Sequence, residues 1–258
     1  MVKIIDRVAF EVAGIEIYWY GIIITFAVLT GFILAVRESK RQSMDPEFFL
    51  DFVIYGLPAA IIGARFYFVI FQWEFYAANP AEIPAIWNGG LAIHGGILGG
   101  LIVLITLCRR RKVSFWQSVD VLAPSLVIGQ AIGRWGNFIN QEAFGGPVTR
   151  EYISRFPEFI QRQMYIGGAY RHPAFLYESL WNVLIFLLLL FFRRRDYIRT
   201  GDIFFLYIGG YSLGRFFIEG LRTDSLMVGP LRVAQFVSAL AVITAIAALV
   251  YRHKIATN

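Results

Sequence analysis

Four polar side chains share one face at the end of an apolar helical run: Tyr211, Arg215, Glu219 and Arg222. Their spacing of i, i+4, i+8 and i+11 places them within an arc of roughly 80° on a helix. A central arginine costs roughly 2.5–3.5 kcal/mol to insert into a membrane, so each one needs a reason. Snorkelling could account for Glu219 and Arg222, and less readily for Arg215, which lies a turn deeper. Arginines in such a setting can bind a phosphate or a carboxylate.

A second cluster of polar residues follows the apolar run at 116–133. Five polar side chains occur within nine residues here: Arg134, Asn137, Asn140, Gln141 and Glu142. Arg134 and Asn137 are three residues apart and share a helix face. A purely structural helix end needs one or two such groups, so the number favours a site.

His94 opens another apolar run, directly before a glycine-rich stretch. Gly95 and Gly99, and Gly96 and Gly100, are spaced four apart, which predicts close helix packing. Backbone N–H groups at such a helix N-terminus are open to an anion. Histidine also has the intrinsic pKa of a general base. The alternative is that His94 is a structural residue whose hydrogen bonds are satisfied within the protein.

Three other features have competing interpretations. Arg65 is a deep arginine that fits either a structural pair or a lipid contact. Tyr20 fits the aromatic belt at a membrane surface better than a substrate contact. The sequence 210–214 matches the G-x-S-x-G pattern of hydrolases, but that motif needs a strand–turn–helix setting and here lies in an apolar helical run.

The elements that position these residues are predicted to be membrane-spanning helices. The chain is 57% hydrophobic and 16% charged, whereas soluble domains carry roughly 25% charged residues. Runs long enough to span a membrane are 18–36, 48–71, 91–108, 116–133, 175–192, 202–219 and 231–251. We therefore expect an all-α polytopic membrane protein with about seven transmembrane helices.

The loops set the expected orientation. Lysine and arginine clusters follow the first, third, fifth and seventh runs; basic loops stay in the cytoplasm, so the N-terminus is expected outside and the C-terminus inside. Residues 134–174 form the longest segment between runs and are expected to make a small extracytoplasmic cap. With no linker or repeat, residues 1–258 are expected to be a single transmembrane catalytic domain.

Several arginines near glycine-rich helix ends suggest an anion held at membrane depth, for which a phospholipid headgroup is the natural ligand. No phosphate-binding loop, dinucleotide motif or metal-ligand spacing occurs, so neither a cofactor nor a metal is expected. The net charge of +6 is spread over short clusters without a basic helix face, so nucleic acid is not expected. A lipid-modifying enzyme and a transporter or scramblase for an anionic lipid or solute both remain open.

The segment 133–142, Gly-Arg-Trp-Gly-Asn-Phe-Ile-Asn-Gln-Glu, closely resembles the signature of the bacterial prolipoprotein diacylglyceryl transferases. Blocks at 19–21, 94–96, 120–124, 172–178 and 211–222 resemble the same family in the same order. The resemblance implies transfer of diacylglyceryl from phosphatidylglycerol to the lipobox cysteine thiol of a prolipoprotein signal peptide. It also implies a multi-pass enzyme of the bacterial inner membrane, in contact with membrane lipids, with its site toward the periplasmic or outer face.

The resemblance also implies roles for single residues. The residues expected to act in catalysis are His94, Arg134, Glu142, Arg215 and Glu219. The residues expected to bind the lipid are Tyr20, Asn137, Asn140, Gly145, His172, Tyr211 and Arg222. In this scheme Arg134 and Arg215 stabilise the departing phosphate, the two glutamates hold the arginines, and the base is either His94 or absent. The resemblance makes Tyr20 a substrate contact.

Overall fold

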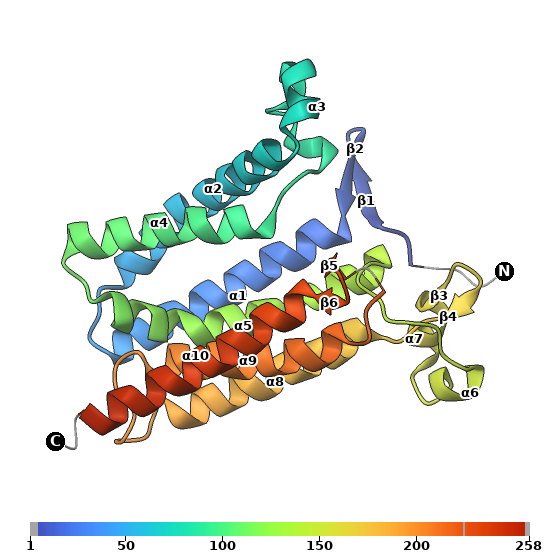
Figure 1. The fold of residues 1–258 in the computed structure, drawn as a ribbon. Helices are drawn as coiled ribbons and strands as arrows, with labels where there is room; N and C mark the ends of the chain where they lie inside the picture. The colour runs from blue at the N-terminus through green and yellow to red at the C-terminus, as the bar shows by residue number, and fades with distance from the viewer. Residues whose placement is uncertain (1–4, 224, 256–258) are drawn as a thin grey trace. The chain divides into compact units, whose positions relative to one another are not determined.

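The computed structural model describes residues 5–223 and 225–255. Those residues contain seven helices of 18 residues or more (Figure 1): α1 (Trp19–Arg41), α2 (Pro46–Phe71), α4 (Ile93–Arg111), α5 (Phe115–Asn140), α8 (Ala174–Phe192), α9 (Asp202–Glu219) and α10 (Val233–Ile255). Each predicted run corresponds to one of them. The main difference is at α5, which continues through the signature to Asn140.

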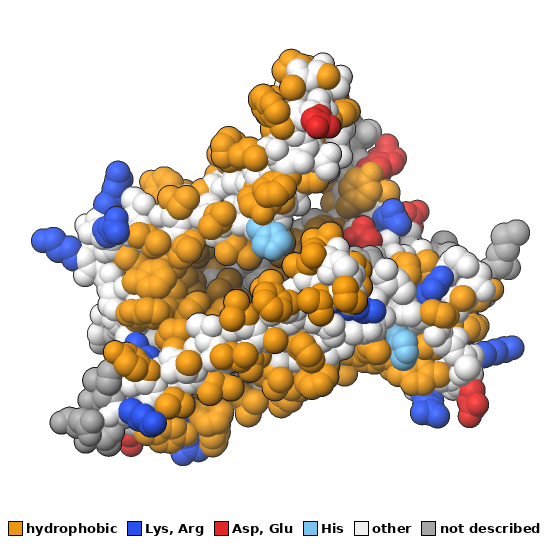
Figure 2. Space-filling model, in the orientation of Figure 1, with side chains coloured by type: hydrophobic (Ala, Val, Ile, Leu, Met, Phe, Trp, Pro, Cys, Tyr) orange, Lys and Arg blue, Asp and Glu red, His pale blue; other side chains and the backbone are white. Residues whose placement is uncertain are grey.

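Five of these helices, α1, α2, α4, α8 and α10, are long and apolar enough to cross a membrane. Hydrophobic side chains cover the helices, and charged side chains gather toward helix ends (Figure 2). The protein is therefore a multi-pass membrane protein. The two long helices that are not among these five, α5 and α9, carry Arg134 and Arg215.

Short elements connect the long helices. The strands are β1 (Val8–Val12), β2 (Ile15–Tyr18), β3 (Tyr165–Ile166), β4 (Ala169–Tyr170), β5 (Met227–Val228) and β6 (Leu231–Arg232). They pair as three antiparallel hairpins. The short helices are α3 (Trp73–Ala78), η1 (Pro80–Glu82), η2 (Ile86–Asn88), α6 (Arg150–Ile153) and α7 (Glu158–Gln163). Two hairpins turn through residues with positive φ, Ala13-Gly14 and Gly167-Gly168, which suits the twist of the strands.

The chain forms two compact units. Unit 1 comprises residues up to 34 and from 122 onward, and unit 2 comprises residues 35–121. Their boundaries lie inside α1 and α5.

In unit 2, α2 and α4 pack backbone against backbone. A Cβ at Gly95 would lie 2.1 Å from the Gly63 carbonyl oxygen, and one at Gly99 would lie 2.2 Å from that of Ala59. The predicted packing role of this pair is confirmed. Gly100 has nothing within 4 Å, so its predicted close packing was wrong: it lies on the side of α4 that faces away from α2.

Arg65 of α2 is buried, with 7% of its surface exposed. Its guanidinium donates hydrogen bonds to the carbonyl oxygens of Glu82 (2.6 Å), Ile83 (2.8 Å), Gly89 (2.8 Å) and Gly90 (3.0 Å). The same group stacks over the ring of Tyr76 at 5.1 Å. Arg65 therefore holds the loop before α4 in place through backbone carbonyls, a role that neither of the two sequence interpretations included.

In unit 1, small residues let α1 approach α5. A Cβ at Gly31 would lie 3.3 Å from the Ser125 carbonyl oxygen, and one at Gly133 would lie 3.6 Å from Ile24. At Gly136 an added Cβ would lie 2.7 Å from the ring of Tyr20. The small residues Ser125, Gly133 and Gly136 of α5 thus form a contact surface for α1.

Glycines also bring α8 and α9 together. An added Cβ would lie 2.7 Å from Ile185 at Gly210 and 2.2 Å from Trp181 at Gly214. The Trp181 indole N–H donates to the Gly210 carbonyl oxygen at 2.8 Å. The G-x-S-x-G pattern is therefore a helix-packing feature of α9, as its apolar setting predicted.

The segment 141–173 folds over one end of α5 and α8. Its apolar side chains form a core with both helices: Phe138, Ile153, Ile160, Met164 and Phe175. The buried Gln163 side-chain amide donates to the carbonyl oxygens of Phe138 and Ile139 at the end of α5. This cap fixes the position at which α5 ends.

Candidate active site

A row of alternating charges crosses three helices of unit 1. Arg134 of α5 contacts Glu178 of α8 at 2.5 Å (Nη2 to Oε1). The other oxygen of Glu178 accepts from Nη1 of Arg215 on α9 at 3.2 Å. Arg215 also contacts Glu219 at 2.6 Å, and Arg222 follows at 3.8 Å from Glu219. Arg215 and Arg134 thus share one carboxylate.

The two kinds of charge differ in depth. The side chains of Glu178 and Glu219 are each 3% exposed, whereas those of Arg134 and Arg215 are 20% and 18% exposed. The carboxylates therefore lie beneath the arginines. Each guanidinium has five N–H donors in a fixed plane, so it can bind a buried carboxylate with some donors and an external anion with others.

Two neutral polar residues border the row. The amide oxygen of Asn137 accepts from Arg134 at 3.2 Å, one helical turn further along α5. The Tyr211 hydroxyl forms a hydrogen bond with Arg134. It also interacts electrostatically with the charges of Glu178 and Arg215. Tyr211 lies one turn before Arg215 on α9. The predicted polar face of α9 is therefore real, and it faces the signature end of α5.

Gly145 links the row to the cap. Its N–H donates to the His172 carbonyl oxygen at 3.0 Å, and it forms a β-bridge with Arg222. A Cβ there would lie 2.5 Å from that of His172, so only glycine fits. Burial lowers the pKa of His172 below its usual value, and its Nδ1 lies 3.3 Å from the Tyr177 hydroxyl. Burial therefore favours the neutral form of His172.

Tyr20 and Asn140 lie at the same end of α5. The ring of Tyr20 packs on Gly136 and is 40% exposed. The backbone carbonyl of Asn140 accepts from the side chain of Arg7 at 2.8 Å. Both residues therefore lie near the end of α5 that carries Arg134 and Asn137.

Two of the predicted residues lie elsewhere. Glu142 is exposed and forms no ion pair with any residue in the described ranges, so the expected pair with an arginine was wrong; its backbone N–H donates to the Asn137 carbonyl oxygen instead. His94 belongs to unit 2, where it is the second residue of α4 and its exposed ring lies 6.0 Å from that of Tyr67.

Glu178 is the residue that sequence reasoning missed. It is a lone carboxylate among apolar residues of α8, and an ionisable side chain in a spanning helix indicates a function or a charged partner by default. That rule, applied to the run at 175–192, would have found it. The two arginines needed a carboxylate, and the nearer candidate in the signature, Glu142, follows a residue with positive φ at Gln141 that turns the chain away.

Comparisons with known proteins show the family of this chain. Residues 7–251 match the family described as prolipoprotein diacylglyceryl transferase. The chain belongs to this family. A phosphatidylglycerol–prolipoprotein diacylglyceryl transferase from Halalkalibacterium halodurans is 52% identical over 98% of this chain and 88% of its own length. Proteins of the same name from Bacillus cereus strain G9842 and from Bacillus anthracis are also 52% identical, over 97% of this chain and 93% of theirs.

In this member of the transferase family, replacement of Glu178 by alanine should leave Arg134 and Arg215 facing each other without a carboxylate. Removing one partner of a buried ion pair costs roughly 3–5 kcal/mol. We therefore expect a loss of about that size in the free energy of unfolding, measured in mixed detergent micelles. Glu142→Ala, an exposed carboxylate without an ion pair, is the matched control and should change it by less than about 0.5 kcal/mol. Equal effects of the two substitutions would contradict the shared-carboxylate geometry.

Proposed function

We propose that this protein transfers the diacylglyceryl group of phosphatidylglycerol to the lipobox cysteine thiol of prolipoproteins, the first step of lipoprotein maturation. The relatives that share half of its residues over nearly their whole length carry this activity in their names. The observation that best supports the chemistry is the pair Arg134 and Arg215, whose partly exposed side chains share one buried carboxylate. This is an arrangement for holding a phosphate at a membrane-embedded site.

The proposed reaction is a substitution at carbon. The substrate's cysteine must lose its proton, because the thiolate is the nucleophile and a free thiol has a pKa of about 8.5. The thiolate electron pair forms a bond to C3 of the lipid's glycerol. The bond from that carbon to the phosphate oxygen breaks, and its electron pair leaves with glycerol phosphate. The peptide product is a thioether.

The arginines act where charge develops. Negative charge moves from sulfur to the departing phosphate oxygen, so fixed cations beside that oxygen stabilise the transition state more than the bound lipid. Arg134 and Arg215 are assigned to this role. Glu178 and Glu219 hold their guanidinium planes, while Asn137 and Tyr211 border the same space and orient the headgroup. Tyr20, Asn140, Gly145, His172 and Arg222 complete the proposed lipid site.

The general base has two proposed assignments. In the first, His94 takes the thiol proton, because histidine is the most frequent general base in enzymes and this ring is exposed at the start of α4. The competing assignment has no base: the field of the arginines alone lowers the pKa of the incoming thiol.

The proposed setting is the bacterial inner membrane, with all seven long helices spanning it. Basic residues end α1, α4 and α10, and retention of basic ends in the cytoplasm places the N-terminus outside. Under that orientation the end of α5, the start of α8 and the end of α9 all face the periplasmic or outer side. This is the side on which an exported prolipoprotein presents its cysteine.

Purified protein in vesicles that contain phosphatidylglycerol should convert a lipobox peptide into a thioether-linked product, detected by its added mass. Arg134→Ala should reduce the rate by roughly 10²–10³-fold, as the loss of one transition-state donor does elsewhere. Arg150→Ala, a surface arginine at the start of α6, serves as the matched control and should retain the rate. Movement of lipid or solute without a covalent product would instead support a transporter or scramblase.

His94→Gln separates the two assignments of the base. If His94 takes the thiol proton, the variant should lose activity, and the pH dependence of its residual transfer rate should differ from that of the wild type. The pH profile of the residual rate measures this. An unchanged profile with substantial activity would remove His94 as the base and favour activation by the arginines alone.

A further inference from the structure

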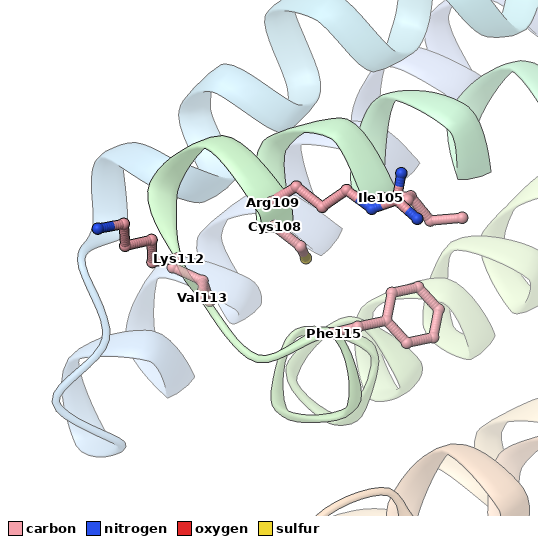
Figure 3. Close-up of a pocket in the computed structure, with 6 residues that line it drawn as sticks. All are labelled: Ile105, Cys108, Arg109, Lys112, Val113 and Phe115. Carbon is pink, nitrogen blue, oxygen red and sulfur yellow. The ribbon is translucent and has the colours of Figure 1, made fainter.

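A second feature with the chemistry of an anion site lies at the other end of α4 from His94. A hollow of about 410 Å³ is lined by Ile105, Cys108, Arg109, Lys112, Val113 and Phe115. In Figure 3 the Arg109 side chain extends along one side of it, with the Phe115 ring opposite and the Cys108 sulfur pointing into the space between them. Lys112 also lines the hollow, but its ammonium group extends away from the Arg109 guanidinium.

The cations of this hollow differ from their neighbour in the same basic run. Arg111 is bound to Asp45 at 3.1 Å and also pairs with Asp51. Within residues 5–223 and 225–255, neither Arg109 nor Lys112 forms an ion pair or a side-chain hydrogen bond. The Arg109 guanidinium, without a carboxylate partner among the described residues, therefore lies beside an apolar-walled space of the size that ligand sites have.

The apolar side chains of α4 that precede Arg109 are suited to contact acyl chains. Leu98, Ile102 and Ile105 precede Arg109 at intervals of eleven, seven and four residues, which places all four on one face of α4. Leu98 is 51% exposed and Ile102 is 64% exposed. A membrane-spanning helix thus presents an apolar stripe that ends at a basic hollow, the arrangement that a phospholipid with an anionic headgroup matches in both its parts.

We propose that this hollow, the α4-end site, binds an anionic phospholipid of the membrane leaflet in which α4 ends. The headgroup phosphate lies against the Arg109 guanidinium, and the acyl chains follow Ile105 and Ile102. Under the orientation proposed above, this is the cytoplasmic leaflet, so the bound lipid is not the substrate. The binding claim itself needs only residues of unit 2 and does not rest on the transferase activity.

Basic residues are common at the cytoplasmic ends of membrane helices whether or not a lipid binds there. The test must therefore compare two variants that lose the same charge at different positions. Arg109→Gln and Arg110→Gln remove the same charge from adjacent residues, and only Arg109 lines the hollow. The probe is phosphatidic acid, in nanodiscs of phosphatidylcholine alone or mixed with phosphatidic acid. After transfer to detergent, native mass spectrometry counts the phosphatidic acid retained per protein.

Wild-type protein and Arg110→Gln should retain phosphatidic acid, whereas Arg109→Gln should bind it roughly fivefold more weakly, as expected for one basic residue at a membrane surface. Ile105→Trp keeps every charge and fills the hollow, so it should also lose the lipid. Equal retention by Arg109→Gln and Arg110→Gln would overturn the proposal. Retention by Ile105→Trp at the wild-type level would do so as well, because binding would then need only surface charge.

Discussion

The carboxylate of Glu178 holds two arginines that come from different helices. One of its oxygens contacts Arg134 of α5 and the other accepts from Arg215 of α9, while Glu178 itself belongs to α8. A buried carboxylate is costly unless its charge is compensated. The three helices are therefore constrained to positions in which both guanidinium groups reach the same side chain, and most other features of unit 1 serve that constraint.

Small residues make those positions possible. Gly214 lies one residue before Arg215, and only a glycine there lets the Trp181 ring of α8 come so near to α9. The Ser179 hydroxyl, next to Glu178, donates to the Ala131 carbonyl oxygen of α5 at 2.9 Å. Close backbones thus occur directly beside the charged side chains. This fixes the side chains within the narrow range that a preorganised anion site needs.

Much of the fold could be predicted because the apolar runs are long and separated by basic or glycine-rich segments. The polar face of α9 and the signature end of α5 were predicted for the same reason: charges in apolar helices stand out. Glu178 was missed because its partners are distant in sequence, at Arg134 and Arg215. Arg65 could not be assigned because its partners are backbone carbonyls, which leave no trace in residue types.

In the proposed mechanism Arg134 and Arg215 act as one unit through Glu178. A double-mutant cycle on the transfer rate tests this directly, using Arg134→Lys, Arg215→Lys and the double variant with the lipobox peptide. Lysine keeps the charge but cannot span two partners with a planar fork. If the arginines act together, the double variant should be about as slow as the slower single variant. Losses that multiply, so that two reductions of roughly 10²-fold combine to roughly 10⁴-fold, would show that the arginines act independently and would contradict the account.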